Sequence, residues 1–282
     1  MIETNNLNFR DSSKVQEEIA KIVYPVGEWE SPFCSYCNSD FRFHKQIYYN
    51  VKNTYHSLVE CQLCKLRFYS PRIKFSSLVK VGFGSYEAAR VEANHCYEHG
   101  SFFDIKNKKE QKAMVRNYYK GNIISKFPKI PISVFEVGGG IGWFSSILKQ
   151  DYGVEIIDGC EINKWSVQIA NEKFGLNYIS GEFNKYTPHR TYECGLMLDY
   201  IEHSYNPFQD LQKMSSMIEK GGTLFIKTFL EELDIERTME APVGHAYHFY
   251  GDVLKKMIID VGFDICYWQE EGVQIIIIGK KR

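Results

Sequence analysis

Two pairs of cysteines have the spacing of a metal-binding site. Cys34 and Cys37 form one Cys-x-x-Cys pair, and Cys61 and Cys64 form a second, with residues 38–60 between the pairs. Two thiolates from one tight turn can face the same ion, so two such turns supply the four ligands of tetrahedral zinc. Four cysteines leave no open coordination position, so we expect a structural zinc, with a hairpin inserted between the pairs. The alternatives are two cysteine pairs that occur by chance or a redox dithiol, although redox motifs usually contain a single pair.

A glycine cluster follows an apolar segment in the middle of the chain. The cluster contains Gly138, Gly140 and Gly142, and Glu136 precedes them. Glycine lets the backbone turn sharply and approach a ligand closely. The dinucleotide pattern would place its third glycine at Trp143, and the Walker A lysine and hydroxyl do not occur in this segment. An acid before the glycines favours a cationic or amine-bearing ligand. The alternative is a glycine turn that serves only packing.

This Glu-x-Gly-x-Gly-x-Gly pattern resembles the first motif of class I S-adenosylmethionine-dependent methyltransferases, and order and spacing agree from Ile132 to Lys281. The resemblance implies that S-adenosylmethionine is the cofactor and that the following residues bind it: Glu136, Gly138, Gly140, Gly142, Glu161, Glu182, Phe183 and Asp199. In this family, Glu161 would accept hydrogen bonds from the ribose hydroxyls. Either Glu182 or Phe183 would flank the adenine ring, and the alternative there is a surface turn.

Three histidines are candidates for the base that removes a proton from the methyl acceptor. His203 follows the fourth apolar segment, at the end of the sheet where ligands bind in doubly wound folds. The resemblance places it near the reacting methyl group. His245 and His248 follow the fifth apolar segment, in a loop that we expect to border the same pocket. The alternatives are structural histidines or, for the His245–His248 pair, a metal whose third ligand stands at no recognisable spacing.

Short apolar segments alternate with amphipathic ones from Ile132 onward, which predicts a parallel sheet covered by helices. The predicted strands are Ser133–Val137, Val154–Cys160, Asn177–Ser180, Cys194–Leu198, Thr223–Thr228, Phe263–Gln269 and Val273–Gly279. The predicted helices are Trp143–Lys149, Trp165–Phe174, Asn206–Ile218 and Gly251–Val261. The last two strands are too close in sequence for a crossover, so they must form an antiparallel hairpin. The expected fold class is α/β, a doubly wound, Rossmann-like sheet of seven mostly parallel strands.

The sequence divides into four expected parts. They are an N-terminal helix (1–30, periodic at 11–23), a zinc-binding unit (31–72), a helical connecting or lid segment (73–130) and the S-adenosylmethionine-binding methyltransferase domain (131–282). Tyr86 and Tyr97 are candidates for a lid over the cofactor, and core packing is the alternative. The segments Phe33–Cys37 and Cys61–Arg72 resemble the zinc-binding segment that precedes certain sugar and natural-product methyltransferases.

The distribution of charge along the chain indicates which kind of methyl acceptor the protein could bind. The chain has 282 residues and a formal charge of −1, yet residues 31–130 hold 17 Lys and Arg against 7 Asp and Glu. This basic segment favours a small anionic acceptor such as a sugar nucleotide or glycan precursor, and a solvated lysine surface is the alternative. An RNA methyltransferase that grips nucleic acid with the zinc unit is a second hypothesis, which the pI of about 6.7 weakens. A non-catalytic binding module is a third.

The expected location follows from two absences in the sequence. No stretch is long and apolar enough to predict a transmembrane helix, and the first residues lack the pattern of a secretory signal. We therefore expect a cytoplasmic protein with no membrane partner. The sequence leaves the oligomeric state undetermined.

Overall fold

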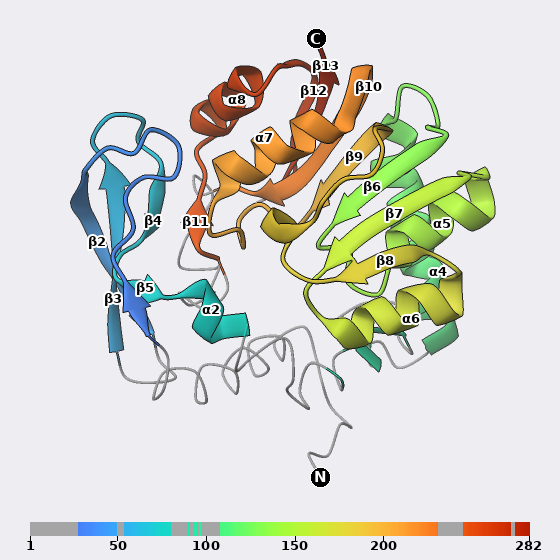
Figure 1. The fold of residues 1–282 in the computed structure, drawn as a ribbon, viewed down its shortest axis with the longest axis horizontal. Coiled ribbons are helices and arrows are strands. Elements are labelled where there is room, and N and C mark those ends of the chain that lie inside the picture. The colour runs from blue at the N-terminus through green and yellow to red at the C-terminus, as the bar shows by residue number, and fades with distance from the viewer. Residues whose placement is uncertain are drawn as a thin grey trace.

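The computed structural model describes residues 28–49, 54–79, 90, 93–94, 96–97, 108–230, 245–271 and 274–282. The helix expected at 11–23 and the lid candidate Tyr86 lie outside these residues. Figure 1 shows a large sheet flanked by helices and, beside it, a small sheet built mainly from the N-terminal part of the chain. Among the described residues, no helix has the length and hydropathy needed to cross a bilayer.

The large sheet has seven strands. In chain order they are β6 (Ser133–Val137), β7 (Ile156–Glu161), β8 (Asn177–Ser180), β9 (Tyr192–Leu198), β10 (Ile218–Phe229), β12 (Phe263–Glu271) and β13 (Gln274–Lys281). The spatial order is β12-β13-β10-β9-β6-β7-β8, and β13 runs antiparallel to both of its neighbours. The predicted α/β fold and its terminal hairpin are therefore confirmed. The strand order reverses between β6 and β9, and ligands of doubly wound sheets bind at the carboxyl ends beside such a point.

Helices cover both faces of the large sheet (Figure 1). They are α4 (Lys108–Tyr118) with the short turns η4 (Tyr119–Ile123) and η5 (Ile124–Lys126), α5 (Trp143–Tyr152), α6 (Lys164–Phe174), the turn η6 (Phe183–Lys185), α7 (Pro207–Met217) and α8 (Gly251–Asp260). Because side chains alternate along a strand, Phe225 of β10 packs on the side of α5 and α6, whereas Leu224 and Ile226 pack with α7 and α8.

Only β6 and β8 match the predicted strands at both ends, and two of the differences at the other strands have a cause in a local turn. β10 begins at Ile218 rather than Thr223, because the intervening glycine turn is an irregularity within its pairing to β9, with Gly221 at a φ of +74°. β7 begins at Ile156 rather than Val154, because the Val154 N–H donates to the Leu148 carbonyl and so still belongs to the end of α5. Both shifts arise from turns that hydropathy does not reveal.

The small sheet contains a strand that the sequence did not predict. β2 (Phe41–Tyr49), β3 (Thr54–Cys61) and β4 (Arg67–Tyr69) come from residues 31–72, which we call the four-cysteine unit. β2 and β3 form the hairpin expected between the cysteine pairs. The fourth strand, β11 (Tyr247–His248), comes from the loop after β10 and pairs antiparallel with β4. Flanking these are β1 (Trp29–Glu30), β5 (Arg72–Ile73) and the short helix α2 (Phe75–Leu78).

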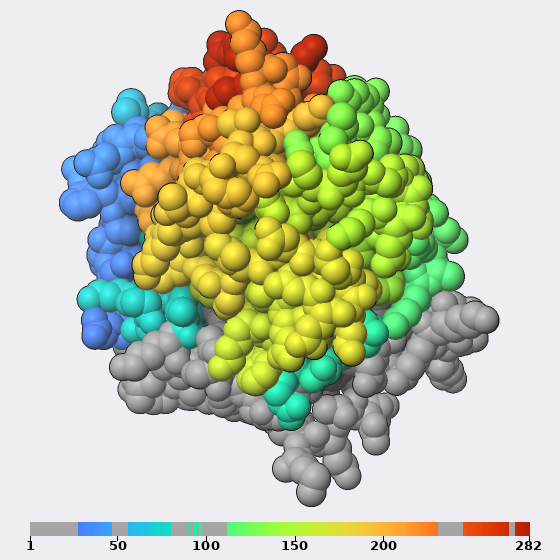
Figure 2. Space-filling view, turned by 45° about the vertical axis from the view of Figure 1, so that its right-hand side comes forward, coloured from blue at the N-terminus to red at the C-terminus, as the bar shows by residue number. Residues whose placement is uncertain are grey.

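One hydrophobic core joins the two sheets. Phe68 of β4 and Tyr247 of β11 belong to the same buried cluster as Leu254 and Met257 of α8. Arg72 is buried beneath this junction, where its guanidinium lies 4.2 Å from the centre of the Tyr205 ring. In Figure 2 the blue and cyan atoms of the N-terminal part abut the orange atoms of the second half. The four-cysteine unit is therefore packed into the molecule rather than tethered beside it.

Candidate active site

The glycine loop between β6 and α5 has the conformation that its residues allow. Gly138, Gly140 and Gly142 all have positive φ, at +67°, +55° and +76°. A Cβ at Gly142 would overlap the side chain of Leu176, so this glycine is needed for packing. A Cβ at Gly140 would meet nothing within 4 Å, so this part of the loop borders open space at the carboxyl end of β6.

Glu136 lies beneath this loop. Its carboxylate is buried and accepts hydrogen bonds from Ser145 of α5, at 2.5 Å, and from Tyr178 of β8. Burial raises the pKa of Glu136 to about 7, against the opposing effect of the two hydroxyl donors. The side chain thus ties β6 to α5 and β8 beneath the glycines. Its contact with the cofactor stays a prediction.

Glu161 ends β7 beside the glycine loop. One carboxylate oxygen accepts the Gly140 N–H at 3.0 Å and the other accepts the Asn163 N–H at 2.7 Å. Burial raises the pKa of Glu161, while these backbone donors and the charge of His203 oppose the shift. His203 therefore lies close enough to act electrostatically on this carboxylate. Asn163 caps α6 through the Trp165 N–H, which fixes the turn that presents Glu161.

The residues expected at the adenine differ in exposure. Phe183 is only 4% exposed, and its ring packs against Phe135 and Tyr200. The Glu182 side chain is partly exposed and pairs with Lys185. Glu182 is therefore the more accessible of the two, and the contact of either residue with adenine stays a prediction.

Asp199 follows β9 with a φ of +50°, which turns the chain sharply at the sheet edge. Its carboxylate oxygens lie 2.6 and 2.7 Å from the ammonium of Lys227 on β10. Lys227 is 6% exposed, so its charge is largely removed from water and is balanced by Asp199. Lys227 was not predicted from the sequence, because a single lysine in an apolar segment gives no indication of its partner on the next strand.

The fold brings two of the three candidate histidines together. The rings of His203 and His245 lie 4.8 Å apart between centroids, and that of His248 lies 6.4 Å from His245. His203 is half-buried, whereas His245 and His248 are buried. His248 belongs to β11, and its ring packs edge-on against Tyr69 of β4. The geometry thus separates His248 from the other two.

Glu202 is a further acid at this place. The backbone N–H groups of Ala246 and Tyr247 donate to the Glu202 carbonyl at 2.8 and 3.2 Å, which fastens the loop before β11 to the turn after β9. Thr228 of β10 donates to the Glu202 carboxylate at 2.7 Å. Ligand atoms of Glu202, His203 and His245 all lie within 4.8 Å of one another. We call these three residues the edge cluster. Glu202 was not among the site residues predicted from the sequence.

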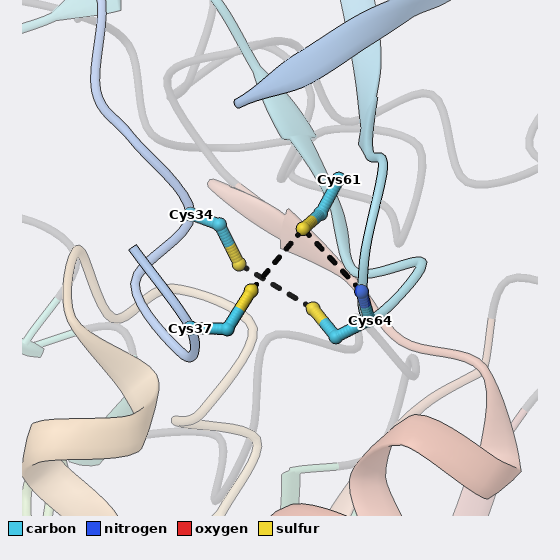
Figure 3. Close-up of side chains that lie close together, drawn as sticks. All are labelled: Cys34, Cys37, Cys61 and Cys64. Atoms are coloured by element: carbon cyan, nitrogen blue, oxygen red, sulfur yellow. Dashed lines mark hydrogen bonds between the residues drawn. The ribbon is translucent and has the colours of Figure 1, made fainter. Parts of the chain in front are cut away.

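The four cysteines also converge, as Figure 3 shows. Sulfur–sulfur distances are 3.4 Å for Cys34–Cys64 and 3.3 Å for Cys37–Cys61. Zinc–sulfur bonds of about 2.3 Å in a tetrahedron require about 3.8 Å between sulfurs, whereas a disulfide requires about 2.05 Å. The hydrogen bond between Cys34 and Cys64 lowers the pKa of the Cys34 thiol to about 5 and raises that of Cys64. The donor set therefore fits tetrahedral zinc after a small expansion.

The two cysteine pairs lie on similar turns. Asn38 follows the first pair with a φ of +53°, and Lys65 follows the second with +68°. In each turn the N–H of this residue donates to the carbonyl of the first cysteine, at 2.8 and 3.2 Å. The Cys64 N–H also lies 3.5 Å from the Cys61 sulfur (Figure 3). This repeated geometry directs both thiols of a pair to one point.

Tyr97 adopts the packing alternative. Its ring lies 5.9 Å from that of Phe174 on α6, and the Lys112 ammonium lies 5.0 Å from the ring centre. Nearby Ala93 and Cys96 are buried against Ile141 of the glycine loop. The described part of the connecting segment therefore supports the back of the loop and α6.

A seven-stranded sheet of this order, with a glycine loop after its first strand and an acid after its second, defines the class I S-adenosylmethionine-dependent methyltransferase fold. A family model described as a methyltransferase domain matches residues 108–267, and the protein belongs to this methyltransferase family. It is an S-adenosylmethionine-dependent methyltransferase.

Solved structures share the fold at low sequence identity. One is an S-adenosylmethionine-dependent methyltransferase from Thermotoga maritima, with a TM-score of 0.50, 20% identity, and coverage of 62% of this chain and 95% of that one. Another is the PH0226 protein from Pyrococcus horikoshii, with a TM-score of 0.52, 14% identity, and coverage of 71% and 100%. A search of curated proteins gives no significant match. These likenesses support the fold alone.

Proposed function

We propose that this methyltransferase modifies a small anionic acceptor, such as a sugar nucleotide or glycan precursor, and that the acceptor loses its proton at the edge cluster. The observation that carries the proposal is the position of His203, which lies in the edge cluster after β9, at the same end of the sheet where Glu161 ends β7 beside the glycine loop. The same end of the sheet would therefore hold the donor through Glu161 and activate the acceptor through the edge cluster. We also propose a cytoplasmic location.

The donor would be held by the glycine loop and by side chains at the carboxyl ends of the neighbouring strands. Ribose hydroxyls would donate to the Glu161 oxygens that the Gly140 and Asn163 N–H groups already approach. Glu182 or Phe183 would border the adenine. Asp199, poised at the end of β9 by Lys227, would face the methionine part of the donor, whose ammonium is complementary to a carboxylate. Glu136 would keep the three glycines in place from below.

The transfer itself is an in-line displacement. With S-adenosylmethionine bound, the acceptor atom would form a bond to the methyl carbon as the carbon–sulfur bond breaks, and the electron pair of that bond would neutralise the sulfonium. A proton leaves the acceptor at the edge cluster, where His203, His245 and, further away, His248 are the candidate groups. Alignment of donor and acceptor in a site sheltered from water supplies much of the acceleration.

Anionic character is proposed from charge. The segment 31–130 carries an excess of ten positive charges, and a negatively charged acceptor would be attracted to it. Zinc, bound by Cys34, Cys37, Cys61 and Cys64, is proposed as a structural ion that stabilises this segment. With all four ligand positions taken by sulfur, it would leave the chemistry to the rest of the chain.

The test uses purified, zinc-replete protein, labelled S-adenosylmethionine and a panel of nucleoside-diphosphate sugars beside total RNA. We expect label in a sugar nucleotide and a KM for that acceptor that rises with ionic strength. Label in RNA alone would contradict the small-molecule acceptor. A KM independent of salt would contradict the electrostatic part of the proposal. Calorimetry with S-adenosylmethionine in the same preparation tests donor binding separately.

A further inference from the structure

The edge cluster has the composition of a metal site. Glu202 and His203 come from the turn after β9, and His245 comes from the loop before β11, more than forty positions later in the chain. Their ligand atoms lie within 4.8 Å of one another. Two imidazoles and one carboxylate bind zinc and other divalent transition metals, and leave positions open for water or substrate. The fold thus places Glu202 and His203 beside His245 as further ligands. His248, the other histidine of the pair considered in the sequence, is not part of this group.

The Glu202 carboxylate gives an independent indication. Glu202 is 1% exposed, and while its Oε2 accepts from Thr228, its Oε1 has no hydrogen-bond partner among the residues that the structure describes. A buried carboxylate oxygen without a donor costs free energy, and such an atom calls for an ion or water. A cation among the three side chains would satisfy this oxygen.

Backbone hydrogen bonds restrict how far the three side chains of the edge cluster can move apart. The Glu202 carbonyl holds the N–H groups of both Ala246 and Tyr247, and β11 is in turn paired with β4. His245 is therefore anchored on its C-terminal side one residue away. His203 is half-buried and forms the accessible side of the cluster. Asp199, the next acid along this edge, is already paired with Lys227 and does not compete for the ion.

We propose that Glu202, His203 and His245 bind a divalent metal ion such as zinc. This ion coordinates an oxygen of the methyl acceptor. The role toward the acceptor rests on the function proposed above. A coordinated hydroxyl loses its proton more readily, so the ion removes the need for a free histidine base. The proton passes to water, the acceptor oxygen bonds to the methyl carbon, and the carbon–sulfur electron pair returns to sulfur. No electron is gained or lost by the metal.

The charges of this arrangement suit a sulfonium donor. The ion and the Glu202 carboxylate together carry one positive charge, and the deprotonated acceptor oxygen carries one negative charge. The group that faces the sulfonium is then close to neutral, whereas an unpaired divalent ion would repel it. The buried carboxylate is therefore a required part of the site.

The experiment loads the metal-free full chain with Co²⁺ or Zn²⁺ and measures metal per chain by mass spectrometry. We expect two ions per chain, one of which gives the intense sulfur-to-cobalt absorption of a four-thiolate site. His245→Ala and Glu202→Gln should each bind one ion and keep that absorption, which also shows that the four-cysteine unit is folded. His189→Ala, a control at a histidine that is half-exposed and lies outside the cluster, should keep two ions.

Two results would overturn the inference. One is a wild-type stoichiometry of a single ion in excess metal, and the other is two ions in His245→Ala. Calorimetry with S-adenosylmethionine and the acceptor assay on the same samples separate this failure from that of the proposed function. A single-ion enzyme that still methylates a sugar nucleotide would leave the acceptor proposal standing with a histidine as the base.

Discussion

The carboxyl of Glu136 should make the stability of this protein fall as the pH rises. Burial raises its pKa to about 7 in the folded state, whereas an exposed glutamate titrates near its ordinary value of 4.5. Between these two values the folded chain holds a proton that the unfolded chain has lost. Since the folded state binds more protons, the free energy of unfolding declines with pH through this window, and the loss is complete above it.

The magnitude follows from the two pKa values. Each pKa unit corresponds to about 1.4 kcal/mol, so the pH step from 5 to 8 should cost about 2 to 3 kcal/mol through this one group. Glu136→Gln keeps a carbonyl oxygen that can accept from Ser145 and Tyr178 but has no titrating proton. Relative to wild type, the variant should therefore gain about 2 to 3 kcal/mol between pH 5 and pH 8.

Urea unfolding of both proteins at several pH values measures this difference. Glu155→Gln, an exposed position just before β7, is the matched control and should follow the wild-type pH profile. Parallel profiles for Glu136→Gln and wild type would refute the reasoning, because they would show that the buried carboxyl titrates at the same pH in the folded and unfolded chains.

Three further outcomes are expected. Glu161→Gln should weaken S-adenosylmethionine binding about ten- to hundredfold, since a charge-assisted hydrogen bond contributes about 1.5–3 kcal/mol. Calorimetry measures this change, with Glu172→Gln at an exposed position as the control. An unchanged Kd would contradict a contact between Glu161 and the ribose. Phe68→Ala removes a buried ring that packs between Phe41 and Tyr247. Urea titrations should show a free energy of unfolding lower by about 3–5 kcal/mol, and a loss below about 1 kcal/mol would contradict a shared core between the two sheets. Cys34→Ser, which removes one thiolate of the four-cysteine site only, should reduce turnover more than donor affinity, because β4 pairs with β11. Equal losses of turnover and donor affinity would contradict this coupling.

The sequence predicted most of the large sheet because its strands are apolar and its turns are short. β6 and β8 begin and end where predicted, since Gly138 and Gly181 follow them directly. The hairpin of β12 and β13 was predicted because the connection between the two strands is too short for a crossover. The four-cysteine site followed from two-residue spacing, which is a local property.

The parts that the sequence did not predict depend on contacts between distant segments. β11 is two residues long and has no periodicity, so only its pairing with β4 defines it. Lys227 pairs with Asp199 across neighbouring strands, and neither residue is close to the other in sequence. Glu202 lies beside His245 because the N–H groups of Ala246 and Tyr247 donate to its carbonyl, and these residues are far from Glu202 in sequence.

The two-residue strand β11 explains why a four-cysteine unit precedes this methyltransferase fold. Cys61 ends β3, β3 pairs with β4, and β4 pairs with β11. Arg67 of β4 also lies with its guanidinium 4.2 Å from the ring centre of Tyr250, so the chain is held at both ends of this short strand. β4 of the four-cysteine unit supplies the partner strand for β11, which begins two residues after His245. The zinc that we propose for the four cysteines would therefore order β11, and with it His245, as well as β3 and β4.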